Sequence, residues 1–185
     1  MNQPKSPRDS ETTITELMVP AYANFGGKIH GGILLSMMDK VAYACATKHT
    51  GMYCVTVSVE NVDFKQPVEV GELVSMDARI NYVGKTSLVV GIRVISENVK
   101  EGISKHTNTS YFTMVAKDDE GKASIIPELI LENSIDVRRF MEAIFRKYQK
   151  SSLRDSMKEI RKKFNLEYEV KKLEDERCII RLDKD

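Results

Sequence analysis

The segment that decides the fold spans residues 30–51 and reads HGGILLSMMDKVAYACATKHTG. After the glycine pair at its start it contains neither glycine nor proline until Gly51, as an uninterrupted α-helix of about four to five turns requires. We therefore predict a helix over residues 33–48 that ends at Gly51. The glycine pair, Gly31 and Gly32, stands at the entrance of this helix, where unobstructed backbone N–H groups meet the positive end of the helix dipole.

Strand-like segments lie on both sides of this helix along the chain. Apolar and polar residues alternate in most of them, which is the pattern of a strand with one buried face. The segment 86–96 is apolar on both faces and suits a central strand. One strand, a long helix and four further antiparallel strands predict an α+β fold, with the helix packed on a curved sheet of about five strands. The predicted strands span residues 12–19, 53–64, 72–83, 86–96 and 106–117.

The overall composition excludes several classes of protein. The 185 residues include 28 Lys and Arg and 27 Asp and Glu, and this net charge of +1 excludes a protein that is basic as a whole. Hydrophobic residues make up 42%, which is typical of a folded chain. No apolar run approaches the ~18–20 residues of a membrane span, and the polar N-terminus lacks the apolar core of a secretory signal. We therefore expect a cytoplasmic protein with no part in the membrane.

The cysteines and histidines indicate a reduced chain without a metal. Cys45, Cys54 and Cys178 are too few and too scattered for a disulfide framework. The three histidines have no metal-ligand spacing, either among themselves or with the cysteines. We therefore expect buried free thiols at Cys45 and Cys54, no metal site and no cofactor.

The small net charge hides an asymmetry between two parts of the chain. Residues 1–137 hold 13 basic and 17 acidic side chains, whereas residues 138–185 hold 15 basic and 10 acidic ones. We therefore predict a flexible N-terminus over residues 1–10, a core domain over residues 11–131, and a charged, largely helical C-terminal extension over residues 132–185. The role of this extension does not follow from its sequence.

Asp39 is the first residue with the potential for chemistry. It lies inside the predicted helix with no cation three or four residues away, so its carboxylate has no local ion-pair partner. It also lies two turns beyond Gly32, roughly 10 Å along the axis. A helix entrance with paired glycines binds anions or a polarised carbonyl oxygen. The residues alone leave two alternatives open: a solvated helix face around Asp39, and glycines at 31 and 32 that only permit close packing.

The turn Gly84-Lys85-Thr86-Ser87 is the second candidate. It is not a nucleotide-triphosphate loop, because the required earlier glycine position is occupied by Arg79 and a strand follows instead of a helix. A hairpin turn of this composition can contact a phosphate or be a solvated turn, and the residues alone favour the second interpretation.

At this point a family resemblance becomes specific. Residues 23–39, ANFGGKIHGGILLSMMD, resemble the signature of the hotdog-fold acyl-CoA thioesterases, in particular the brain-type and bacterial acyl-CoA hydrolases. The resemblance covers roughly residues 11–131, about two-thirds of the chain. Further collinear matches are VTVSVE (55–60), VDF (62–64), VGE (70–72) and VGKTS (83–87).

The resemblance implies a fold, an assembly and a reaction. The long helix is wrapped by the curved antiparallel sheet, and two such hotdogs pair edge to edge, often as trimers of dimers that make a hexamer. The active sites lie at the dimer interface, with Asn24 from one protomer and Asp39 from the other. The implied reaction is the hydrolysis of fatty acyl-CoA to a free fatty acid and coenzyme A, with coenzyme A as part of the substrate and no separate cofactor.

The resemblance also implies roles for the candidate residues. Asp39 is expected to be the general base or the nucleophile, Asn24 to orient water or substrate, and the N–H groups of Gly31 and Gly32 to polarise the carbonyl. Coenzyme A leaves as a thiolate with a pKa near that of cysteine, ~8.5, so the reaction needs little general-acid help. The implied contacts of the coenzyme A nucleotide are Gly84, Lys85, Thr86 and Ser87, with Arg93 as a weaker one.

Two other functions remain as alternatives. One is a non-catalytic hotdog that binds acyl-CoA as a regulatory ligand and uses its basic C-terminal extension to contact a partner or nucleic acid. The other is a hotdog dehydratase with His30 as the catalytic residue. The simultaneous presence of Asn24 and Asp39 favours the hydrolase, and the mixed charge of the extension argues against nucleic-acid binding.

Overall fold

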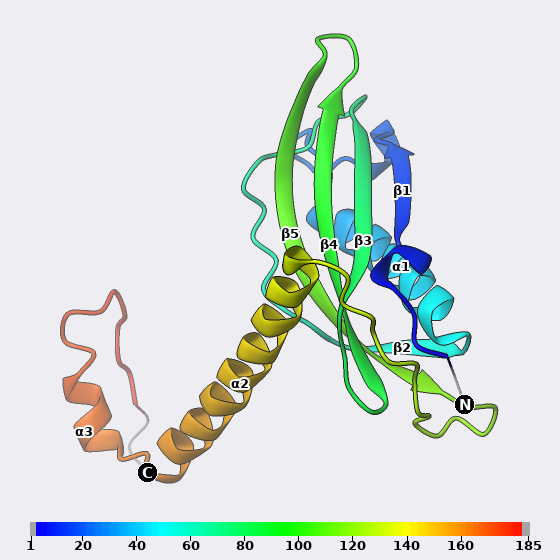
Figure 1. The fold of residues 1–185 in the computed structure, drawn as a ribbon. Helices are drawn as coiled ribbons and strands as arrows, with labels where there is room; N and C mark the ends of the chain where they lie inside the picture. The colour runs from blue at the N-terminus through cyan, green and yellow to red at the C-terminus, as the bar shows by residue number, and fades with distance from the viewer. Residues whose placement is uncertain (1–2, 183–185) are drawn as a thin grey trace. The chain divides into compact units, whose positions relative to one another are not determined.

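A 20-residue helix, α1 (Gly31–Thr50), lies against one face of a five-stranded antiparallel sheet (Figure 1). The computed structural model describes residues 3–182. Among the described residues, two 3-10 helices and one strand precede α1, four strands follow it, and two further helices follow the last strand. The bounds of these elements are η1 Pro7–Asp9, β1 Thr12–Leu17, η2 Pro20–Tyr22, β2 Tyr53–Val59, β3 Leu73–Val83, β4 Ser87–Asn98, β5 Ile103–Lys117, α2 Ser134–Lys162 and α3 Leu166–Lys171.

The strands lie in the order β1-β3-β4-β5-β2, and each neighbouring pair is antiparallel. β4 occupies the centre of the sheet, as its two apolar faces predict. β1 and β2 form the two edges. The predicted α+β architecture, a long helix on a curved sheet of five strands, is therefore confirmed.

The core lies between α1 and the sheet. Every second residue of β3 and of β4 faces the helix and is buried, while the residues between them face the opposite side of the sheet. One side of α1 contributes the other half of the core, and the opposite side of α1 is exposed. The core residues of these three elements include Leu34, Met38, Val41, Cys45, Val74, Met76, Ala78, Ile80, Leu88, Val90, Ile92 and Val94.

Both ends of α1 are capped, which makes the helix longer than predicted. His30 is the N-cap, and its Nδ1 accepts a hydrogen bond from the Gly32 N–H at 2.9 Å. Gly51 follows the last turn with φ 69°, in the left-handed region that glycine adopts without strain. The helix consequently gains residues at both ends beyond the predicted range 33–48.

The N-terminal residues differ from the predicted flexible segment. Lys5 pairs with the chain near Leu129, donating its N–H to the Glu128 carbonyl at 2.9 Å and accepting one from Ile130 at 2.9 Å. Ser6, Pro7 and Ser10 are buried. This order comes from pairing with residues more than one hundred positions later, which a local pattern does not reveal. Residues 1–2 of that predicted segment lie outside the described residues.

The chain divides into two compact units between Ile144 and Phe145, later than the predicted boundary at residue 131. The start of α2 belongs to the first unit, because the buried Asp136 forms an ion pair with Arg79 of β3. In the second unit, α3 is capped by Asn165, whose Oδ1 accepts the Tyr168 N–H at 3.0 Å. The last three residues of the predicted extension, 183–185, are not among those described.

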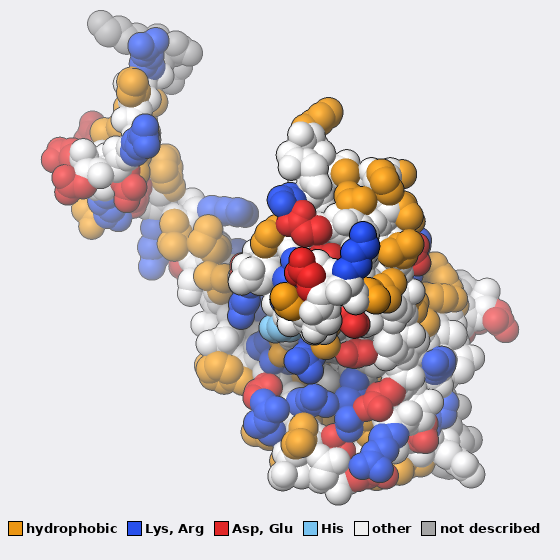
Figure 2. Space-filling view, turned by 90° about the horizontal axis from the view of Figure 1, so that it is seen from above, with side chains coloured by type: hydrophobic (Ala, Val, Ile, Leu, Met, Phe, Trp, Pro, Cys, Tyr) orange, Lys and Arg blue, Asp and Glu red, His pale blue; other side chains and the backbone are white. Residues whose placement is uncertain are grey.

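The described residues 3–182 also bear on the predicted thiols, membrane spans and surface charge. Cys45 and Cys54 are buried free thiols, as predicted, and Cys178 is exposed. None of the described helices is long and apolar enough to cross a membrane. On the face in Figure 2, Lys and Arg side chains are interspersed with Asp and Glu side chains, in keeping with the small net charge.

Candidate active site

Asp39 lies on the exposed side of α1 and is held there by the edge strand β2. The hydroxyl of Thr56 on β2 donates to Asp39 Oδ1 at 2.6 Å. The ladder between β2 and β5 shifts register between Thr56 and Ser58, so Thr56 stands where the strand leaves regular pairing. The other carboxylate oxygen, Oδ2, accepts no hydrogen bond from any residue between 3 and 182. The structure therefore presents a carboxylate with one fixed oxygen and one free oxygen.

This carboxylate opens into a hollow of about 450 Å³ between α1 and the end of the sheet. Tyr43 and Tyr53 form part of its wall, with ring centroids 6.1 Å apart. The hollow is therefore aromatic and apolar on one side and carries Asp39 and Thr56 on the other. The full lining is Asp39, Lys40, Tyr43, Tyr53, Cys54, Val55, Thr56 and Met114.

Cys54 is the one thiol that lines this hollow, and its surroundings disfavour it as a nucleophile. Burial raises the pKa of the Cys54 thiol, against a smaller opposite effect of its contact with the Thr50 hydroxyl at 3.3 Å. A thiol is nucleophilic as the thiolate, which this environment disfavours. The reactive group of the hollow is therefore the carboxylate.

Asn24 lies in the loop before α1, and its side chain stabilises that loop. Its Oδ1 accepts the N–H of Gly26 at 2.9 Å and that of Lys28 at 3.2 Å, and Gly27 completes the turn with φ 76°. Since the oxygen is used by the loop, the amide group Nδ2 is the part that projects away, and it has no partner among the described residues. Asn24 can therefore donate a hydrogen bond to an incoming oxygen atom.

The glycine pair at the entrance of α1 serves packing and also leaves one donor free. A Cβ atom on Gly31 would lie 3.1 Å from the Phe64 ring, and one on Gly32 would lie 3.0 Å from the His30 ring. The N–H of Gly32 is already bonded to His30. The N–H of Gly31 has no acceptor in the part of the chain that the structure describes. Of the two predicted carbonyl-polarising groups, Gly31 is the one that is available.

Within one chain these groups do not meet. Gly31 and Asp39 are on the same helix, eight residues and about 12 Å apart along its axis. The hollow at Asp39 is lined by neither Asn24 nor either glycine. One chain therefore holds the candidate residues in two separate groups. We call them the donor half-site, Asn24 and Gly31, and the carboxylate half-site, Asp39 and Thr56, of the candidate site.

The surface around the carboxylate half-site exposes apolar side chains, as surfaces that pair with another chain do. It lies beside the free edge of β2, where Tyr53 is 61% and Val57 is 55% exposed. Leu35 and Tyr43 on the neighbouring side of α1 are also exposed. An edge strand flanked by exposed apolar side chains is a place where another strand pairs.

The turn Gly84–Ser87 joins β3 to β4 at the same end of the sheet. The Gly84 N–H donates to the Ser87 carbonyl at 2.7 Å, and Lys85 is exposed. Ser87 pairs with Val115, which in turn pairs with Val55 of the Asp39 hollow. Two strand spacings separate Ser87 from that hollow, about 10 Å. The turn is therefore within reach of a ligand that extends from the carboxylate.

Arg93, the weaker predicted contact, lies elsewhere. It is six residues beyond Ser87 on β4, about 20 Å along the strand. It also points to the face of the sheet opposite α1, since its buried neighbours Ile92 and Val94 face the core. The structure does not bring Arg93 together with the turn.

Comparisons with known proteins agree with this geometry. Residues 26–103 match the model of the thioesterase superfamily. Protein VdlD of Helicobacter pylori is 47% identical over 131 residues, which are 71% of this chain and 75% of that protein. An apo-hexameric acyl-CoA thioesterase superposes with a TM-score of 0.78 and 33% identity over 81% of this chain and 96% of that one. The chain belongs to the hotdog-fold acyl-CoA thioesterase family.

A second solved member of this thioesterase family carries ligands. The acyl-CoA hydrolase of Staphylococcus aureus, in complex with butyryl coenzyme A, coenzyme A and coenzyme A disulfide, has a TM-score of 0.76 and 28% identity over 85% of this chain and 96% of its own. The mouse cytosolic acyl coenzyme A thioester hydrolase is 26% identical over 76% of this chain, which spans only 37% of that longer protein.

Sequence reasoning missed Thr56, which the structure adds to the candidate site through its hydrogen bond to Asp39. Its segment was predicted only as a strand in which valines alternate with polar residues. That alternation could have pointed to Thr56, because the polar position there is the half-buried one. Val57 and Val59 are exposed, whereas Thr56 is half-buried and its hydroxyl donates to Asp39 of α1. A hydroxyl on the core-facing side of a strand, with valines on the exposed side, reverses the usual pattern and marks a position that serves a polar partner.

Proposed function

We propose that this chain hydrolyses fatty acyl-CoA thioesters to a fatty acid and coenzyme A. The observation that carries the proposal is the Asp39 carboxylate, held through Oδ1 by Thr56 and free at Oδ2, in an open hollow beside the sheet edge of an acyl-CoA thioesterase fold. The Staphylococcus aureus hydrolase has been solved with an asparagine, an aspartate and a threonine each replaced by alanine. The three replaced residues have the same spacing along their chain as Asn24, Asp39 and Thr56 here, which supports this choice of residues.

The complete site in this proposal needs two copies of the chain. Asn24 and Gly31 come from one protomer and Asp39 and Thr56 from its partner, since one chain holds them as separate half-sites. The exposed apolar edge at β2 supports pairing there, and relatives of this fold are hexameric. We propose edge-to-edge dimers, three of which form a hexamer, in the cytoplasm as the name of the cytosolic mouse relative suggests.

The chemistry follows from the free atoms of the two half-sites. The Asn24 amide and the Gly31 N–H donate to the thioester oxygen, where negative charge develops. Asp39 Oδ2 takes a proton from a water molecule, whose oxygen bonds to the carbonyl carbon. The carbon–sulfur bond then breaks and the electron pair leaves with the sulfur of coenzyme A. Since no metal or cofactor takes part in these steps, the proposed enzyme uses coenzyme A only as a portion of its substrate.

Asp39 can alternatively attack the carbonyl carbon directly. The first product would then be a mixed anhydride between Asp39 and the acyl group, which water cleaves in a second step. A single turnover in H₂¹⁸O separates the two routes by mass spectrometry of the protein. Label in the Asp39 carboxylate requires cleavage of the anhydride at the Asp39 carbonyl carbon and indicates the nucleophile. Label in the fatty acid alone arises from the general base and also from an anhydride cleaved at its acyl carbon, so the acid-quenched protein is examined in the same turnover for a covalent acyl adduct, which only the nucleophilic route forms.

The turn supplies the remaining contacts in the proposal. Lys85, Thr86 and Ser87, on the Gly84 hairpin, are proposed to bind phosphate or ribose oxygens of coenzyme A, about 10 Å from the carboxylate. Arg93 is too far along β4 to share that contact within one chain.

A thiol-release assay over acyl-CoA substrates of increasing chain length tests the function. We expect turnover with at least one substrate and a loss of several orders of magnitude in Asp39→Ala, with coenzyme A still bound. Absence of release with every substrate would instead favour the regulatory acyl-CoA-binding module.

Mixing two inactive variants tests the shared site. Asn24→Ala and Asp39→Ala are each expected to be inactive, but a dimer of one with the other has one intact site of its two. Random mixing by co-expression should therefore restore about a quarter of the wild-type activity. No restoration, with mixed dimers verified by mass, would show that both residues act within one chain.

A further inference from the structure

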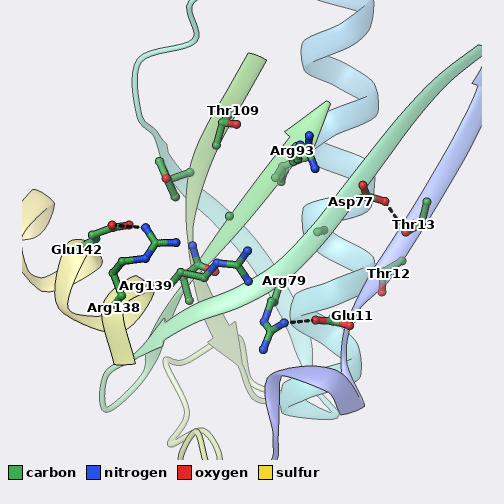
Figure 3. Close-up of a pocket in the computed structure, with 15 residues that line it drawn as sticks. Glu11, Thr12, Thr13, Asp77, Arg79, Arg93, Thr109, Arg138, Arg139 and Glu142 are labelled. Atoms are coloured by element: carbon green, nitrogen blue, oxygen red, sulfur yellow. Dashed lines mark hydrogen bonds and ion pairs between the residues drawn. The ribbon is translucent and has the colours of Figure 1, made fainter. Parts of the chain in front are cut away.

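A second hollow lies on the face of the sheet opposite α1. It has a volume of about 460 Å³, within the roughly 300–1,000 Å³ typical of small-molecule sites. Outward-facing residues of β3, β4 and β5 form its floor, and the first turns of α2 form one wall (Figure 3). The hollow at Asp39 is on the other side of the sheet and shares no residue with it. Its charged lining residues are Glu11, Asp77, Arg79, Arg93, Arg138, Arg139 and Glu142.

Every carboxylate of the second hollow is already engaged. Glu11 forms an ion pair with Arg79 at 2.6 Å, and the Thr13 hydroxyl donates to Asp77 at 2.7 Å. Glu142 pairs with Arg138 on α2 at 2.5 Å. Figure 3 draws these three interactions as dashed lines. The acidic groups are therefore bound by neighbours on the rim of the hollow.

Two arginines remain without such partners. The side chains of Arg93 on β4 and Arg139 on α2 form neither a hydrogen bond nor an ion pair with any residue from 3 to 182. Asp77 lies opposite Arg93 in the β3–β4 ladder, yet no ion pair joins them. The hollow therefore carries two guanidinium groups whose charge the described side chains do not neutralise by direct contact.

The floor of the hollow contains a largely buried amide, that of Asn81, which also has no hydrogen-bond partner among the described residues. Asn81 of β3 is only 6% exposed. The β3–β4 register shifts between Ile80 and Tyr82, on either side of it. Gly91 faces Asn81, and a Cβ there would lie 2.4 Å from Asn81 Nδ2. Asn81 is largely buried, lines the hollow and has no protein partner for its amide, so the amide is available to bind a ligand there.

We propose that this hollow binds the phosphoryl group of a small molecule, at a site separate from the thioester site. Planar guanidinium groups donate paired hydrogen bonds that match phosphate oxygens, and the buried amide adds a further donor. A phosphate monoester carries about −1.5 to −2 charges near pH 7, which Arg93 and Arg139 attract. The lining holds four arginines and three carboxylates, Asp77 included, which is an excess of one positive charge. The phosphoryl group belongs either to a free metabolite or to a coenzyme A molecule, and the experiment below distinguishes these sources.

Calorimetric titration of inorganic pyrophosphate into the full-length protein tests the proposal. The titration is made at low ionic strength, where charge interactions are least screened, first without and then with saturating coenzyme A. We expect one pyrophosphate per chain in both cases if the ligand is a free metabolite. If the pyrophosphate binding that depends on Arg93 and Arg139 disappears when coenzyme A is present, coenzyme A itself supplies the phosphoryl group.

Variants locate the binding. Arg93→Gln and Arg139→Gln should each weaken pyrophosphate binding at least about tenfold, whereas the exposed Arg154→Gln, outside the hollow, should leave it unchanged. Asn81→Asp keeps the shape of the side chain but adds a negative charge to the floor, and it should abolish binding while circular dichroism and thermal unfolding remain close to wild type.

The opposite pattern would overturn the proposal. Binding that is lost in Lys85→Gln but retained in Arg93→Gln and Arg139→Gln would place the phosphates at the Gly84–Ser87 turn alone. No measurable binding of pyrophosphate to the wild-type protein at low ionic strength would also reject the site.

Discussion

Replacing Thr56 by valine removes one hydrogen-bond donor and little else. Valine has nearly the same shape as threonine, and Thr56 is half-buried on an edge strand where valine is well tolerated. The lost interaction is the 2.6 Å hydrogen bond from Oγ1 to Asp39 Oδ1. Without it the carboxylate can rotate away from the orientation in which Oδ2 faces the hollow. We therefore expect Thr56→Val to fold normally and to hydrolyse acyl-CoA slowly.

The size of the effect follows from the kind of hydrogen bond. A hydrogen bond to a charged group contributes about 1.5–3 kcal/mol, which corresponds to roughly a 10- to 160-fold change in rate. Asp39 is exposed in the single chain, which favours the lower end. We expect a fall of about 10- to 30-fold in kcat with a much smaller change in KM, because Thr56 positions the reacting carboxylate and does not hold the coenzyme A nucleotide.

The assay is steady-state thiol release with the best acyl-CoA substrate, measured beside Thr56→Ser. Serine keeps the hydroxyl and should recover most of the rate, and thermal unfolding should be within a few degrees for all three proteins. Wild-type kcat in Thr56→Val, or equal loss in Thr56→Ser and Thr56→Val, would refute the positioning role and leave Thr56 as a packing residue.

Three further perturbations test the fold. Burial alone would raise the pKa of Glu72, but hydrogen bonds from Lys105, Ser96 and a backbone N–H outweigh it and lower the pKa. The carboxylate therefore stabilises the fold above about pH 4.5, and this contribution is lost as the pH falls through the lower folded pKa. In denaturant unfolding between pH 7 and pH 3, the free energy of unfolding should decline less steeply in Glu72→Gln than in wild type. Gly51→Ala forces a side chain into the left-handed region and should lower the free energy of unfolding by about 1 kcal/mol, seen as a lower Tm, whereas an unchanged Tm would mean that the helix ends differently in solution. Truncation after Ile144 should leave the first unit folded. Truncation before Asp136 removes the buried partner of Arg79 on β3 and should lower the free energy of unfolding by about 3 kcal/mol or more. Equal stability of the two truncated proteins in urea would contradict this.

Elements with strong local signals were predictable from the sequence. The run from Gly31 to Gly51 defines one helix, and only its caps added residues at the ends. The strands follow from alternation, and the central place of β4 follows from its two apolar faces. These features depend on neighbours within a few positions, which is the range that a single sequence displays.

Features that depend on distant pairing were not predictable in the same way. The order of residues 5–10 comes from Lys5 and the chain around Leu129, and the bond between Thr56 and Asp39 comes from how an edge strand meets a helix. Asp39 itself was ambiguous from periodicity and was favoured only through the family signature. For Arg93 the signal was present: the alternation of β4 places it on the face opposite Val94, away from the turn.

In the proposed two-chain site, the separation of the two half-sites would make catalysis depend on the concentration of the protein. At protein concentrations below the dissociation constant of the dimer, most chains are monomers. In a monomer, neither half-site has its complement from a second chain. The rate per chain should then fall in proportion to total protein as the sample is diluted, although every molecule remains folded. Assembly at the β2 edge would thus act as a switch that leaves newly made, unpaired chains unable to consume acyl-CoA.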